Sequence, residues 1–116
     1  MHLFDSHCHL DDKAYRSDRE TVLQRAREAG VVGFMVVGID PRTAREAIRI
    51  AEAEPGVFAS VGVHPHDAAR CSDAVLSELT ALADHPKVRA WGETGLDFNR
   101  MHSPREDQER CFRRQL

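Results

Sequence analysis

The chain has 116 residues, of which 41% are hydrophobic and 30% are charged, and its net charge at pH 7 is −3. These values are typical of one globular domain with a modest core, and they exclude a disordered chain and a global positive field that would attract a polyanion. No apolar run of about 18 residues or signal-peptide pattern is present, and three cysteines do not make a disulfide frame, so we expect a cytoplasmic protein without a membrane span.

Apolar, β-branched runs alternate with amphipathic helical stretches along the chain. The first predicted strand covers residues 3–9, and the next helix is predicted to begin at a capping box at residues 17–20 and to end at Gly30. The second predicted strand, residues 31–37, is almost wholly apolar, which is typical of a strand buried on both faces.

The second helix has clear start and stop signals. Asp40 is a predicted N-cap, Pro41 occupies the first helical position, and the Pro55-Gly56 pair ends the helix. The third predicted strand covers residues 57–63.

The same unit then recurs twice. Ser72 is predicted to cap the third helix, the fourth strand covers residues 88–93, and a capping box at residues 103–106 opens the fourth helix. Alternating strands and helices with short connections predict a parallel sheet with right-handed crossovers. Two architectures fit this pattern: an open doubly wound sheet, which the length alone favours, or part of a (β/α)8 barrel, which needs eight units and about 250 residues.

Polar residues that can carry chemistry gather where the predicted strands end. They are Asp5, His7 and His9 at the first strand, His64 and His66 at the third, and Glu93 and Asp97 at the fourth. Parallel α/β folds build their sites at this carboxyl edge. The gathering favours the barrel, so we predict an α/β fold in which residues 1–116 form the N-terminal four βα units of a (β/α)8 barrel.

His7 and His9 are the first candidate metal ligands. Alternation along a strand directs both side chains and that of Asp5 to one side, and directs Cys8 to the other. Two imidazoles one pleat apart can bind one metal ion. Asp5 is placed to accept the free N–H of a ligating ring and fix its tautomer.

Glu93 is the third candidate ligand. A carboxylate can bridge two cations, whereas a histidine cannot, so Glu93 would allow a two-metal site. His66 follows His64-Pro65 in a stiff loop, and a general base, a phosphate contact and a plain loop residue all remain open for it. Asp97 is either an acceptor behind the site or a turn residue.

Three segments resemble the signatures of TatD-type hydrolases. They are residues 4–10 (FDSHCHL), 62–66 (GVHPH) and 92–98 (GETGLDF), in the family's order and on the first, third and fourth strands. The resemblance covers the whole chain, but only about half of a typical family member. It implies a (β/α)8 barrel with a two-metal centre that hydrolyses phosphodiester bonds of DNA, with a preference for 3′–5′ exonuclease action.

Carried over by position, the resemblance implies that His7 and His9 bind one metal and that Glu93 bridges both. We take Glu93 and His66 as the candidate catalytic residues, and we expect supporting or substrate contacts from Asp5, His64 and Asp97. The mixed ligands suit zinc, manganese or magnesium, and the histidines argue against magnesium as the tightest occupant. The family takes its remaining ligands, two histidines and an aspartate, from later strands, and this sequence ends before them. We therefore expect the isolated chain to be poorly active.

Other readings of the same residues stay open. One is a different His-x-His metal hydrolase: an amidohydrolase, against which Glu93 argues, or an aminoacyl-ester hydrolase. The other is a non-catalytic half-barrel that self-associates, because an open four-stranded sheet leaves two strand edges unpaired.

Overall fold

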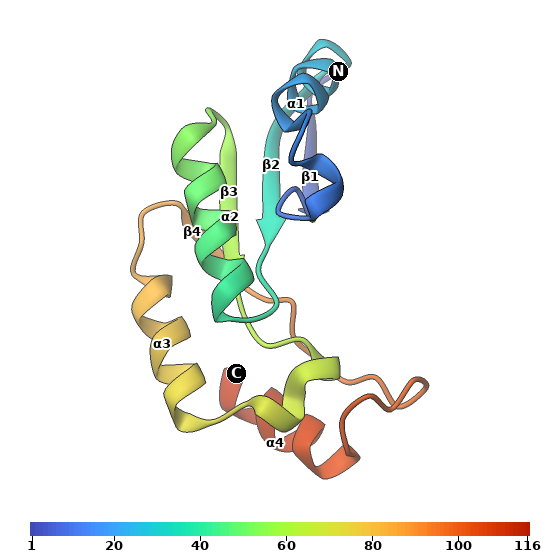
Figure 1. Ribbon diagram of the computed structural model, residues 1–116, viewed down its shortest axis with the longest axis vertical. Coiled ribbons are helices and arrows are strands. Elements are labelled where there is room, and N and C mark those ends of the chain that lie inside the picture. Colours follow the sequence, from blue (N-terminus) through green and yellow to red (C-terminus); the bar gives the residue numbers. More distant parts are fainter.

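A computed structural model describes residues 1–116 as a four-stranded, fully parallel sheet in the order β1-β2-β3-β4 (Figure 1). The strands are β1 (Leu3–Cys8), β2 (Val31–Val37), β3 (Val57–Val61) and β4 (Val88–Trp91). The parallel order confirms the prediction of successive βα units. Strands β1, β3 and β4 end one or two residues earlier than predicted, so His9 and Glu93 lie in the loops just past β1 and β4.

Each strand is followed by a helix. The helices are α1 (Arg19–Glu28), α2 (Pro41–Ala53), α3 (Asp73–Ala83) and α4 (Arg105–Gln115), with short 3-10 helices η1 (Lys13–Tyr15) and η2 (Pro65–Arg70). The strands run toward the end of the molecule at which η2 and α4 lie (Figure 1). No helix has the length and apolar character needed to cross a membrane.

Helices α1, α2 and α3 cover one face of the sheet. Leu23 of α1 and Ile50 of α2 are buried against β2 and β3, and Leu79 of α3 is buried beside Val61. On the other face the rings of Phe4 and Phe58 stack with centroids 6.4 Å apart. Phe4 is nevertheless 50% exposed, so this second face is only thinly covered.

The predicted helix caps are confirmed at α2 and α3. Asp40 Oδ1 accepts the Thr43 N–H at 2.7 Å, and Thr43 Oγ1 accepts the Asp40 N–H at 3.0 Å, which makes a reciprocal capping box. Ser72 Oγ accepts the Val75 N–H at the start of α3. Since these caps follow β2 and β3, they fix where the loops at the carboxyl edge turn into helix.

Two predicted caps are wrong. Helix α1 begins after Asp18 with no side-chain capping bond, so the box at residues 17–20 does not form. Ser103, which is 1% exposed, donates its hydroxyl to the His66 carbonyl at 2.7 Å and accepts the Ala69 N–H at 3.1 Å. Its oxygen is therefore used to hold the start of α4 against η2, and no side chain caps α4.

Strand β1 contains an irregularity that the sequence does not reveal. Asp5 pairs with Phe34 and Cys8 pairs with Val36, so an advance of three residues along β1 corresponds to an advance of two residues along β2. The extra residue interrupts the simple alternation that we expected to put Asp5 on the same side as His7. Cys8 faces the helices, as expected: it packs against the core and donates its thiol to the Met35 carbonyl at 3.2 Å.

Candidate metal centre

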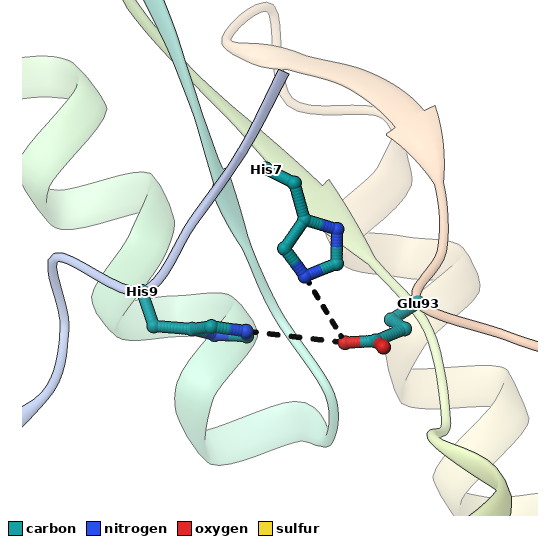
Figure 2. Close-up of side chains that lie close together, drawn as sticks. All are labelled: His7, His9 and Glu93. Carbon is teal, nitrogen blue, oxygen red and sulfur yellow. Dashed lines mark ion pairs between the residues drawn. The ribbon is translucent and has the colours of Figure 1, made fainter. Parts of the chain in front are cut away.

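His7, His9 and Glu93 come together at the carboxyl edge of the sheet (Figure 2). His7 Nε2 lies 3.4 Å and His9 Nε2 3.9 Å from Glu93 Oε2. All three side chains point toward one another although β1 and β4 are the outermost strands of the sheet. Curvature of the sheet toward a barrel brings these two edges together, and no local sequence signal requires it.

The donor set fits a divalent metal ion. One potential ligand atom from each of the three residues lies within 4.8 Å of the others. Ligands about 2.1 Å from one ion at tetrahedral angles are about 3.4 Å apart, close to the two distances measured to Glu93. The side chains of His7 and His9 are 52% and 44% exposed, so an ion and a substrate can reach them.

The two oxygens of Glu93 face different histidines. While Oε2 faces His7 and His9, Oε1 lies 3.4 Å from His64 Nε2. His64 Nδ1 accepts the His66 backbone N–H at 3.0 Å, so the proton of a neutral His64 ring sits on Nε2, the nitrogen near Glu93. Burial lowers the pKa of His64, and the nearby Glu93 carboxylate opposes this shift. The net lowering favours the neutral ring at pH 7.

Asp5 does not contact either imidazole. Its Oδ1 accepts the backbone N–H of His7 at 3.2 Å instead of a ring N–H. The reason is the irregularity in β1, which places Asp5 opposite Phe34 and out of step with His7. The expected role of Asp5 in fixing a histidine tautomer is therefore absent from this structure.

His66 and Asp97 form a second pair next to the cluster. His66 Nε2 lies 2.6 Å from Asp97 Oδ2, and the His64 and His66 rings are 4.3 Å apart between centroids. Asp97 Oδ1 accepts the backbone N–H groups of Asn99 and Arg100, so Asp97 is both an acceptor for His66 and a turn residue. These bonds, first that from Arg100 and then that from His66, lower the pKa of Asp97 to about 2.

Two glutamines of α4, absent from the sequence-based predictions, hold the loops of the site. Gln108, which is 1% exposed, accepts the Asp97 N–H at 2.7 Å and donates to the carbonyls of Asp97 and Ser103. Gln115 exchanges two bonds with the Val63 backbone, directly before His64. Polar residues of an amphipathic helix look alike in a sequence, and only burial would have singled these out.

The fold and the cluster define a class of protein: parallel βα units with a candidate His-His-Glu metal centre at the carboxyl edge. A family model described as "TatD related DNase" matches residues 4–116. The chain belongs to this family.

Among its relatives, proteins named "3'-5' ssDNA/RNA exonuclease TatD" are 43% identical in Musicola paradisiaca and 44% identical in Pantoea vagans, each over 115 residues. Both alignments cover 98% of this chain but 44% of the relative. The chain thus spans somewhat less than half the length of the relatives it matches.

Solved structures of the family have the same fold over the matched part. A TatD family hydrolase from Entamoeba histolytica superposes with a TM-score of 0.90 at 26% identity, covering 99% of this chain and 44% of that one. A TatD homologue from Escherichia coli gives 0.86 at 34% identity, covering 97% and 44%. Residues 1–116 therefore have the fold of four βα units of a (β/α)8 barrel, as predicted.

Proposed function

We propose that this protein takes part in metal-dependent hydrolysis of phosphodiester bonds in DNA, acting from the 3′ end of a strand. The observation that carries the proposal is the convergence of His7 and His9 on one oxygen of Glu93. The names of the relatives, which describe 3′–5′ exonucleases of single-stranded DNA and RNA, support the substrate class and the direction.

His7, His9 and Glu93 would hold one divalent ion, zinc or manganese before magnesium, because two of the three donors are imidazoles. Glu93 would also help to hold a second ion, because a carboxylate can bridge two cations. Divalent ions in such a site supply Lewis-acid stabilisation of the charge that develops on the phosphoryl and leaving oxygens.

His64 acts as a positioning residue for Glu93. Its Nε2 lies 3.4 Å from Oε1, and attraction between this N–H and the carboxylate keeps the carboxylate from turning away from His7 and His9. The His66 backbone fixes the His64 tautomer, so the loop after β3 controls the orientation of a side chain after β4.

His66 is the candidate group for proton transfer. When its Nε2–H donates to Asp97, Nδ1 of the neutral ring is unprotonated and can take a proton from an attacking water. The ionised Asp97 then stabilises the imidazolium that forms, as the aspartate does in a Ser-His-Asp triad.

The test is digestion of a 5′-labelled DNA single strand by the wild-type protein and by Glu93→Gln, with and without a chelator. Glu93→Gln should lower the rate about a hundred- to thousand-fold, as removal of one pre-organised electrostatic contact does elsewhere. Glu109→Gln is the matched control, because the two side chains are 32% and 34% exposed and Glu109 lies on α4 away from the cluster. A near-normal rate for Glu93→Gln would refute the proposal.

A further inference from the structure

A basic groove leads away from the candidate metal centre. Two cavities of about 470 Å³ and about 540 Å³ lie between the η1–α1 segment and α2, and both are lined by Asp11, Arg16 and Arg42. The first also includes His9, and the second continues to Arg49. Because the two cavities share these three lining residues, we call them together the arginine groove; its arginines are Arg16, Arg19, Arg42, Arg45 and Arg49.

The charge of the groove is opposite to that of the whole chain. Its lining holds six basic residues, Lys13 and the five arginines, against three acidic ones, Asp11, Asp12 and Glu46. The chain as a whole carries a net charge of −3. A local excess of positive charge in a concave surface focuses the field and attracts an anion that the rest of the molecule would repel.

Two arginines of the groove have no protein partner. Arg49 is paired with Glu46 at 2.6 Å, Arg19 donates to the Leu10 carbonyl at 2.7 Å, and Arg45 pairs with Glu78. Arg16 and Arg42 form no ion pair and no side-chain hydrogen bond, and both are exposed. They flank the part of the groove that the two cavities share, so their guanidinium groups are available to a ligand.

The shape and chemistry of the groove suit a chain of phosphates. Guanidinium groups bind phosphate oxygens bidentately, and a run of them along a path can contact successive phosphates of one strand. The lining has no phenylalanine, tyrosine or tryptophan on which a base could stack, and Ile39 is its only hydrophobic side chain. Single-strand binders that grip the bases use aromatic platforms, so this groove is suited to the backbone and would be indifferent to sequence.

We propose that the arginine groove binds backbone phosphates of the nucleic-acid strand on the 5′ side of the cleaved bond. This inference rests on the proposed function, since it takes the cleaved phosphate to lie at His7, His9 and Glu93. An enzyme that removes 3′-terminal nucleotides keeps hold of the strand on its 5′ side. The groove opens beside His9 and gives that strand a positively charged path away from the metal centre.

The test measures binding without turnover. Fluorescence anisotropy of a 5′-labelled oligothymidylate, with EDTA present, gives the dissociation constant at several salt concentrations for the wild-type protein and for an Arg16→Gln/Arg42→Gln variant. The variant should bind at least about tenfold more weakly, and loss of two phosphate contacts should flatten the slope of log K against log salt by about 1.4. Arg105→Gln/Arg113→Gln removes the same charge from α4, outside the groove, and should keep the wild-type slope.

A variant that should bind the oligonucleotide more tightly and a small diester substrate provide two further controls. Glu46→Gln removes an acid from the groove and releases Arg49, so it should tighten binding of the oligonucleotide. Hydrolysis of bis(4-nitrophenyl) phosphate should be unchanged in the Arg16/Arg42 variant, because its single phosphate lies at the metal centre and leaves no second phosphate for the groove.

If the Arg16→Gln/Arg42→Gln variant binds the oligonucleotide with wild-type affinity and salt slope, the groove does not bind the strand. The proposed hydrolase function would be unaffected by that result. If a full-length protein that contains these residues cleaves neither the oligonucleotide nor the small diester, the proposed function fails. The EDTA binding series would still decide whether the groove binds a strand.

Discussion

His66 Nε2 lies 2.6 Å from Asp97 Oδ2, the shortest contact between a histidine ring and a carboxylate in the molecule. It links the loop after β3 to the loop after β4, and Gln108 holds the backbone of Asp97 from α4. The position of His66 over the site therefore depends on residues from three separate segments of the chain.

Acid should weaken this link only at very low pH. The pKa of Asp97 falls from its ordinary value near 3.8 to about 2 in the folded protein. A carboxyl whose pKa is lower in the folded than in the unfolded state contributes stability above the unfolded pKa, and this contribution is lost as pH falls from about 4 to about 2. Unfolding free energies measured by urea denaturation should thus depend less steeply on pH in this window for Asp97→Asn than for the wild type. Identical pH dependence of the two proteins would contradict the assignment.

A side chain at position 62 should disturb the site through the backbone. A Cβ on Gly62 would lie 2.9 Å from the carbonyl carbon of Gly92, the residue before Glu93, and backbone atoms there cannot simply rotate away. Gly62→Ala should cost about 1–3 kcal/mol of stability, as overpacking does, and should weaken metal binding because Glu93 moves with Gly92.

Gly92→Ala is the matched control for that variant. A Cβ on Gly92 meets nothing closer than 3.9 Å, so this change should leave the free energy of unfolding and the metal affinity nearly unaltered. Thermal unfolding and calorimetric metal titration of both variants give the comparison. If Gly62→Ala binds metal as tightly as Gly92→Ala does, the close approach of the two loops does not govern the position of Glu93.

The chain of residues 1–116 should self-associate when prepared alone. Strands β1 and β4 are both edge strands of the sheet, and Phe4 and Val32 are 50% and 57% exposed. Unpaired strand edges with apolar neighbours favour pairing with another chain, most simply as a twofold dimer. Light scattering over a dilution series should show dimers at micromolar concentration, and Phe4→Glu should shift them toward monomers. A well-folded wild-type monomer at that concentration would refute this prediction.

Local sequence signals predict much of this fold. The apolar run at residues 31–37 is strand β2 with the predicted bounds, and Asp40 and Ser72 cap their helices because their oxygens need only nearby N–H groups. The capping box at residues 103–106 has the same local pattern and fails. Ser103 is buried where the His66 carbonyl and the Ala69 N–H compete for its hydroxyl.

Part of the site likewise follows from local sequence signals, and part depends on the tertiary structure. Alternation in a strand is enough to put His7 and His9 side by side, but it misplaces Asp5 because an extra residue in β1 leaves no mark in the composition. The approach of Glu93 to His7 depends on the curvature of the whole sheet. The roles of Gln108 and Gln115 depend on burial beneath loops that are distant in sequence.

The central claim is that His7, His9 and Glu93 bind a divalent metal ion, and calorimetric titration of the protein with Zn²⁺ or Mn²⁺ tests it most directly. Wild-type protein should bind the ion, and His7→Ala/His9→Ala should lose that binding while its thermal unfolding stays cooperative. His85→Ala is the control, because His85 pairs with Glu52 at 3.1 Å away from the cluster. Unchanged affinity and stoichiometry in the His7/His9 variant would contradict the account.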